Sequence, residues 1–278
     1  MCAKYSDIMD NKQPIVNSNR QQRLVIRVSQ GHMSFSTVIE GQVVYSPYSL
    51  NSSISVTANL REALRSEPLL SKSYDQVLVM LGSPALMVPT DLFREEECEQ
   101  LYRHAFSQRD QQSISHTVLP DLNAVVIYPI LKDLRTVLGD SFKNVRYVPV
   151  MAPVWRHFYQ RSFTGQHQKL YAYFHERQME VFSFAQNRFK FCNSFAVNNP
   201  NDALYYLLAV WKQLGMVPEH DELHLAGEVP DKEQLIDEAS KFVKRVFYTN
   251  PSGEFNRSPI TQIEGIPYDL MVLYIKGR

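Results

Sequence analysis

Apolar and polar positions along the chain follow the same order twice, and the two copies are 146 positions apart. The stretch that begins at Leu24 stays in phase, without a gap, with the stretch that begins at Leu170. The aligned pairs include Met33 with Met179, Phe35 with Val181, Val38 with Phe184, Val43 with Phe189 and Tyr45 with Phe191. Much further along, residues 75–79 align with residues 221–225. A repeat of this size predicts two lobes of the same plan with a ligand-sized cleft between them.

Each copy is predicted to begin with three strands, because β-branched and aromatic residues are concentrated between short turns. The strands are residues 23–29, 33–40 and 42–48 in the first copy, and residues 170–175, 179–185 and 188–195 in the second. Apolar spacing then predicts a helix and a buried strand in each copy. These are residues 58–65 and 77–81 in the first copy, and residues 203–214 and 222–226 in the second.

The remaining elements complete a mixed sheet with helices in each half. In the first half they are a strand at 86–88, a helix from Thr90 or Asp91 to about 106, strands at 113–118 and 124–129, a helix at 131–138 and a strand at 145–150. A helix at 154–161 leads into the second copy, which continues with a helix at 231–243, a strand at 246–249 and a last strand at 270–275 that has no predicted partner. Each half therefore has the order β-β-β-α-β-α-β. We expect an arm at 1–22, a first lobe at 23–150 with an insertion near 85–118, and a second lobe at 151–278.

Four short motifs carry a resemblance to a known family. They are LMVPTDLF at 86–93, FCNSF at 191–195, NDALYYLL at 201–208 and DELHLAGE at 221–228. The chain resembles bacterial proteins of similar length that share an actin-like ATPase fold and have no assigned biochemistry. The resemblance covers essentially the whole chain after the arm. It implies an α/β protein with a duplicated ribonuclease-H-like (actin-like ATPase) fold, and it supplies no catalytic residues.

Composition excludes several classes of partner. The chain has 29 basic and 29 acidic residues in 278, so nothing in its net charge favours nucleic acid or an anionic membrane. Residues 1–22 lack an apolar core, and no stretch approaches the ~18 apolar residues of a membrane span. Three scattered cysteines are too few for a disulfide framework or a zinc site. We expect a cytoplasmic protein with an unidentified protein or peptide partner; the oligomeric state is not predicted.

Actin-like ATPases hold phosphates in a hairpin turn between the first two strands of each lobe. Each turn needs glycine for close backbone approach, and nearby acids position magnesium and water. In the first lobe this turn contains Ser29, Gln30 and Gly31. Gly31 matches the expected glycine, but Ser29 stands in the place of the acid.

The second-lobe turn departs further from that pattern. It contains His175, Glu176 and Arg177, so the glycine and the acid are both missing at the matching positions, and Glu176 is a shifted candidate for the acid. The adenosine-side turn at Gly227 and Glu228 keeps one glycine of the usual pair. A missing charge-assisted contact costs roughly 1.5–3 kcal/mol. Because several are missing together, we predict that ATP hydrolysis has been lost and that no cofactor is required.

Three interpretations of the cleft remain open. The turns are ordinary hairpins, or they form a degenerate cleft for a peptide or an anion with His175 and Arg177 as donors. The favoured function is non-enzymatic binding or scaffolding through the cleft or the sheet edges. The alternative is a divergent nucleotide-binding protein or ATPase, in which Glu176 and Glu228 help to position a metal with ATP.

Other chemical motifs favour structural roles. His220 and His224 lead into a predicted strand, where residues four apart lie about 13 Å apart, so they are not expected to share a zinc ion. A nuclease would need carboxylates on the first strand, which carries Arg27 and Ser29 instead. The aromatic residues in the second and third strands of the second copy are expected to form core beneath the helix at 203–214, with an exposed interface as the alternative. They are Phe182, Phe184, Phe189, Phe191 and Phe195.

Overall fold

The structure is a computed structural model that describes residues 22–29, 31–106, 111–185 and 188–277. The predicted arm at 1–22 therefore lies outside the described residues, except for its last position. The strands are β1 (Arg23–Ser29), β2 (Met33–Ile39), β3 (Gln42–Tyr48), β4 (Gln76–Gly82), β5 (Leu86–Pro89), β6 (Gln112–Leu119), β7 (Ala124–Leu131), β8 (Val145–Pro149), β9 (Lys169–His175), β10 (Gln178–Ala185), β11 (Arg188–Ala196), β12 (Glu222–Gly227) and β13 (Arg245–Tyr248). The helices are α1 (Val56–Ser66), α2 (Cys98–Ala105), α3 (Lys132–Ser141), α4 (Met151–Ser162), α5 (Pro200–Gln213), α6 (Lys232–Ser240), α7 (Pro251–Glu254) and α8 (Tyr268–Lys276).

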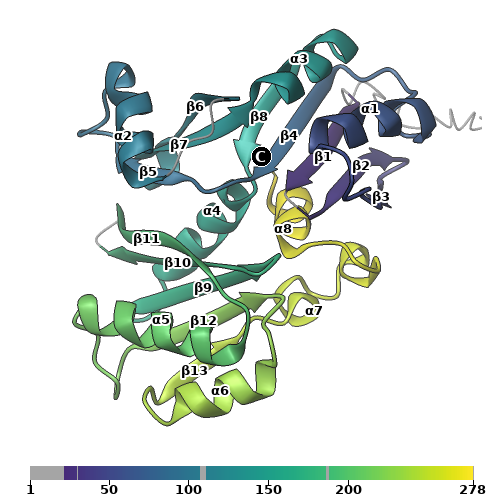
Figure 1. Ribbon diagram of the computed structural model, residues 1–278. Coiled ribbons are helices and arrows are strands. Elements are labelled where there is room, and N and C mark those ends of the chain that lie inside the picture. Colours follow the sequence, from purple (N-terminus) through teal and green to yellow (C-terminus); the bar gives the residue numbers. More distant parts are fainter. Residues whose placement is uncertain (1–21, 30, 107–110, 186–187, 278) are drawn as a thin grey trace, which may run out of the picture.

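Two five-stranded sheets have the same topology. Their strand orders are β3-β2-β1-β4-β8 and β11-β10-β9-β12-β13. We call the first sheet with α1 and α3 the first lobe, and the second sheet with α5 and α6 the second lobe (Figure 1). A third sheet, β5-β7-β6, lies with α2 beside the first lobe. The predicted division of the chain at residue 150 stays a prediction.

Strand pairing repeats at the offset that the hydrophobic pattern predicts. Matching pairs are Leu24–Val77 and Val28–Met33 in the first lobe, and Leu170–Leu223 and Phe174–Met179 in the second. Each pair of the second lobe lies 146 positions after its counterpart. Because one shared offset reproduces both the antiparallel and the parallel neighbours of the first strand, the predicted duplication is confirmed.

Helices α4 and α8 lie between the lobes (Figure 1). One apolar core contains the first sheet, both of these helices and the inward-facing residues Tyr171, Phe182 and Ala226 of the second sheet. A second core lies between the outer face of the second sheet and α5 with α6. The lobes are therefore packed on shared helices, and the first outer helix of each lobe begins at a side-chain cap. Ser55 caps α1 and Asn199 caps α5 through side-chain oxygens that accept backbone N–H groups.

The predicted strand at residues 270–275 is wrong, because this segment belongs to α8. Residues 268–273 are all buried, so the run has no polar face from which a helical period could be read. Pro267 precedes the helix, and a proline beside a buried apolar run is compatible with either assignment. The error matters because α8 carries a charged residue of the candidate site.

The helix predicted from Thr90 or Asp91 is also shorter than expected. The N–H of Thr90 donates to Asn123 O, and Leu92 N–H donates to Pro89 O, so the chain turns before any helix begins. A 3₁₀ turn at Glu95–Glu97 then leads into α2. The acidic residues before α2 therefore predict that a helix follows, but they do not predict the residue at which it begins.

The aromatic cluster is divided between the two faces of the second sheet. Phe191 and Phe195 pack in the core with α5, as predicted, whereas Phe182, Phe184 and Phe189 pack in the core that contains α4. The pairing register of β10 with β11 shifts beside Phe184. Such a bulge places residues two apart on opposite faces, which a strict two-residue period does not predict.

Candidate functional site between the lobes

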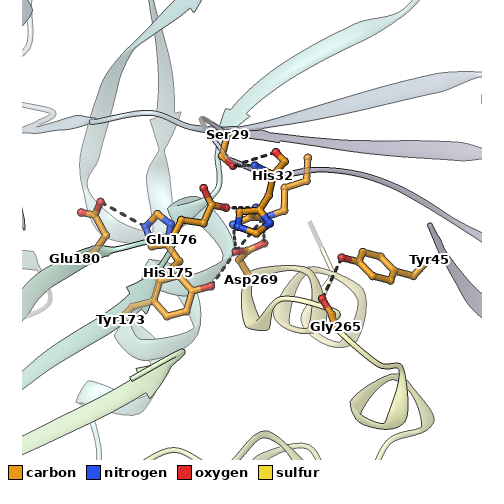
Figure 2. A network of polar contacts seen from close by, with 10 residues as sticks. Ser29, His32, Tyr45, Tyr173, His175, Glu176, Glu180, Gly265 and Asp269 are labelled. Carbon is orange, nitrogen blue, oxygen red and sulfur yellow. Dashed lines mark hydrogen bonds and ion pairs between the residues drawn. The ribbon is translucent and has the colours of Figure 1, made fainter. Parts of the chain in front are cut away.

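Two equivalent strands of the duplication send side chains to the same carboxylate. Arg27 of β1 and Tyr173 of β9 lie 146 positions apart in the sequence. Arg27 Nε donates to Asp269 Oδ1 over 3.0 Å and Nη2 donates to Oδ2 over 3.1 Å. Tyr173 Oη donates to Asp269 Oδ2 over 2.9 Å. Asp269 in the first turn of α8 thus joins the two lobes at matched positions (Figure 2).

This network is buried, so its charges depend on one another. Arg27 is 3% exposed and Asp269 is fully buried. Burial alone would lower the pKa of Arg27, but the carboxylates of Asp269 and Glu176 raise the pKa well above its ordinary value. Burial, together with the Asp269 charge, raises the pKa of Tyr173. Arg27 is therefore a permanent cation and Tyr173 a permanent hydrogen-bond donor.

The second-lobe turn reaches across to the first lobe. Glu176 and Arg177 form a two-residue hairpin loop, and both have left-handed backbone angles, with φ of 49° and 63°. Such loops favour Asn-Gly, because each ordinary residue in this region costs about 1–2 kcal/mol. The carboxylate of Glu176 accepts a hydrogen bond from Arg27 Nη1 at 2.5 Å. Glu176 thus forms an ion pair with the other lobe from a backbone conformation that is itself unfavourable.

Electrostatics at Glu176 favour its charged form. Burial would raise the pKa of this carboxyl, but the Arg27 guanidinium holds it below its ordinary value. The first-lobe turn is closed by the Ser29 hydroxyl: Ser29 Oγ donates to His32 O over 3.0 Å and accepts from His32 N–H over 3.1 Å. A side chain of the second-lobe turn therefore meets β1 of the first lobe, in the position where the resemblance implies phosphate-binding backbone.

Four of the candidate residues line one cavity of about 330 Å³ between the lobes, and they are His175, Glu176, Gly227 and Glu228. Arg27, Tyr45 and Tyr173 also contribute to its wall. Ser29 instead lines a separate cavity of about 260 Å³ beside the third sheet. Gly31 and Arg177 are exposed turn residues. Gln30 lies outside the described residues.

Gly227 is required by its surroundings. Its φ is +83°, and a Cβ atom there would lie 2.2 Å from Phe174 O and 2.7 Å from the Tyr173 ring. The glycine therefore permits β12 to end against β9, and the following Glu228 N–H donates to Phe174 O over 2.9 Å. This role is structural packing; no nucleotide is needed to explain it.

The histidines that could suggest zinc have other partners. His224 Nε2 lies 2.9 Å from Glu222 Oε2, and the ring of His220 stacks on that of His167. In the described part of the chain, no three His, Cys, Asp or Glu side chains are arranged to hold a metal ion. Within the same residues, no helix has both the length and the hydropathy needed to cross a bilayer.

Sequence reasoning missed the centre of this site. In the sequence, Arg27 serves only to argue against a nuclease. An arginine within an otherwise apolar strand also indicates a buried ion pair, because a buried arginine needs an anionic partner. The alignment also pairs Arg27 with Tyr173. Asp269 was hidden because its helix was predicted to be a strand.

Comparison with known proteins agrees with this architecture. A family model described as protein of unknown function (DUF3822) matches residues 11–246. A Bacteroides thetaiotaomicron VPI-5482 protein with an actin-like ATPase fold and unknown function is 31% identical, with 91% of this chain and 95% of that chain covered and a TM-score of 0.80. A chain of the PilM–PilN type IV pilus biogenesis complex is 10% identical, with 91% and 97% covered and a TM-score of 0.50, which shows the fold alone.

None of the curated proteins matches the chain. The matched family model and the Bacteroides structure both span most of the sequence. The chain has an actin-like ATPase fold and belongs to the DUF3822 family of proteins of unknown function.

Proposed function

We propose that this protein is a non-enzymatic binding or scaffolding protein whose nucleotide site is degenerate. The observation that carries the proposal is the 2.5 Å contact between Arg27 Nη1 and Glu176 Oε1. In an actin-like ATPase, the turn that contains Glu176 would offer bare backbone N–H groups to phosphate. Here it offers a carboxylate, and the Arg27 guanidinium is already neutralised by two acids.

Electrostatic repulsion supports the same proposal. A triphosphate between the two turns would lie against the Glu176 carboxylate, and displacing that carboxylate would break its charge-assisted hydrogen bond with Arg27. Loss of one such bond costs roughly 1.5–3 kcal/mol, although Asp269 still holds Arg27. ATP would have to supply this energy before any net binding.

A partner-binding role is also compatible with the fold. The PilM–PilN complex shows that a chain of this architecture occurs in a protein assembly. This is an argument by analogy, because a shared fold does not carry function with it. The proposed partner is a protein or peptide that binds at the interlobe cavity or at a sheet edge.

Thermal unfolding with and without Mg-ATP tests the proposal. A ligand at 100 times its Kd stabilises the native state by about 2.7 kcal/mol. We expect the Tm of the full chain to be unchanged across millimolar Mg-ATP and Mg-ADP. A concentration-dependent rise in Tm would overturn the proposal in favour of a divergent nucleotide-binding protein, and phosphate release above a Glu176→Gln control would identify an ATPase.

A further inference from the structure

Carboxylates outnumber cations around the interlobe cavity of about 330 Å³. Arg27, Glu176 and Glu228 line it, and Asp269 lies directly behind Arg27. Arg27 is shared between Glu176 and Asp269, so its charge is more than neutralised. Glu228 is exposed and adds a third negative charge. Three carboxylates beside one guanidinium make the charge around the cavity negative, which favours a cationic ligand.

A buried histidine at the same cavity lacks a hydrogen-bond partner. His175 is 8% exposed, and within the described residues neither of its ring nitrogens makes a hydrogen bond. Its Nε2 lies 3.7 Å from Glu180 Oε1, which is beyond hydrogen-bond distance. Its ring stacks on that of Tyr173, with a centroid distance of 5.2 Å. Both residues are labelled in Figure 2. Both nitrogens are covered by protein atoms, so His175 contributes to the cavity through a ring packed on Tyr173 and not through a hydrogen bond.

Aromatic rings form much of the remaining wall. Tyr45 and Tyr48 come from β3 of the first lobe, whereas Tyr173 and Tyr268 come from the second lobe and α8. The Tyr45 hydroxyl donates to Gly265 O over 3.1 Å, which fixes this ring across the cavity. Tyrosine faces attract ammonium and guanidinium groups, most strongly where water is excluded. The volume lies near the lower end of the ~300–1,000 Å³ range of ligand pockets and suits one side chain better than a nucleotide.

We propose that this cavity binds a basic side chain, arginine or lysine, of a partner protein or peptide. The carboxylates of Glu176 and Glu228 attract the charge, and the tyrosine rings contact the side chain. The inference rests on the proposed binding function and specifies the chemistry of its ligand. The same charge distribution that repels phosphate attracts this ligand.

Isothermal titration of the full chain with three small probes tests the proposal. The probes are Nα-acetyl-arginine amide, Nα-acetyl-lysine amide and the uncharged isostere Nα-acetyl-citrulline amide. We expect saturable binding of at least one cation at millimolar concentration and at least about tenfold weaker binding of citrulline amide. Glu228→Gln should weaken binding of the cation by about fivefold, the upper range for one exposed ion pair. Glu228 is exposed, so this variant is expected to keep the wild-type Tm.

Glu233→Gln is the matched control, because Glu233 is exposed on α6 of the same lobe and does not line the cavity. This variant should bind the cation as the wild type does. Equal binding of arginine and citrulline amides, no saturable binding, or an equal effect of the two glutamate variants would overturn the inference. Each of those outcomes would overturn only the proposed ligand, because none of them predicts a change of Tm with Mg-ATP. A Tm that rises with Mg-ATP would overturn the proposed function itself.

Discussion

The two lobes share strand order and register, yet they use matched positions for different purposes. Arg27 and Tyr173 both donate to Asp269, but only Arg27 brings a charge into the core. In the first lobe, the turn is closed by the Ser29 hydroxyl, whereas the turn of the second lobe sends Glu176 across the cavity. Duplication therefore fixes where side chains point, while their chemistry is free to diverge. Substitutions at matched positions can separate these two contributions.

The largest difference is expected between Arg27→Met and Tyr173→Phe. Arg27→Met leaves Asp269 and Glu176 without their cation, so the free energy of unfolding should fall by about 3–5 kcal/mol. Tyr173→Phe removes one hydrogen bond to a charged group and should lower it by about 1.5–3 kcal/mol. Urea denaturation of both variants measures the difference. Equal losses would mean that the charge of Arg27 contributes nothing beyond its hydrogen bonds.

Gly227→Val against Leu81→Val is the second comparison, since Leu81 lies 146 positions before Gly227. A side chain at Gly227 meets Phe174 O and requires a disfavoured backbone angle, so we expect a loss of about 3 kcal/mol or more. Leu81→Val only trims a buried side chain and should cost about 1 kcal/mol. Thermal melts report both. Wild-type stability of Gly227→Val would contradict the close approach of β12 to β9.

The pH dependence of stability isolates the ion pair of Glu176. The pKa of Glu176 is lower in the folded than in the unfolded chain. The carboxylate therefore stabilises the fold fully at a pH above its pKa in the unfolded chain, and this stabilisation is lost as the pH falls through its pKa in the folded chain. The stability difference between wild type and Glu176→Gln should therefore be largest near neutral pH and shrink below about pH 4.5. Denaturation of both proteins across this range measures it. Glu99→Gln, at an exposed position, serves as the control.

Arg177 is expected to show the smallest effects. It is exposed in its turn, so Arg177→Glu should change the free energy of unfolding by less than about 0.5 kcal/mol. Arg177→Gly matches the glycine found at the equivalent Gly31 and relieves a left-handed angle, so it should stabilise the protein by up to about 1 kcal/mol. Urea midpoints of both variants test this. Unfolding of Arg177→Glu would show that the turn is placed incorrectly.

Most of the fold could be predicted from the sequence, because alternating and helical periods report which side chains face the core. These periods predict the first three strands of each lobe and the buried strand that follows them. The method failed for α8, since a helix that is buried on every side has no polar face. It also failed at the bulge beside Phe184, because one shift in pairing reverses the faces of the residues that follow.

The candidate site was predicted only in part. Glycine and acid patterns indicated the turns, and four of the candidate residues line one cavity. Neither the glycine pattern nor the acid pattern shows which charged side chains are in contact in the folded protein. Arg27 and Asp269 are separated by 242 positions, and only the packing of α8 between the lobes brings them together. Whether the candidate residues bind anything stays a prediction.

The same separation has a consequence for synthesis on the ribosome. The nascent chain exposes Arg27 long before Asp269 has been translated, so the first sheet cannot bury this guanidinium with its final partner as soon as its strands have emerged. Burial of Arg27 therefore has to wait for α8, which carries Asp269. Until then we expect the guanidinium to stay in contact with water, because burying a charge without its partner is costly.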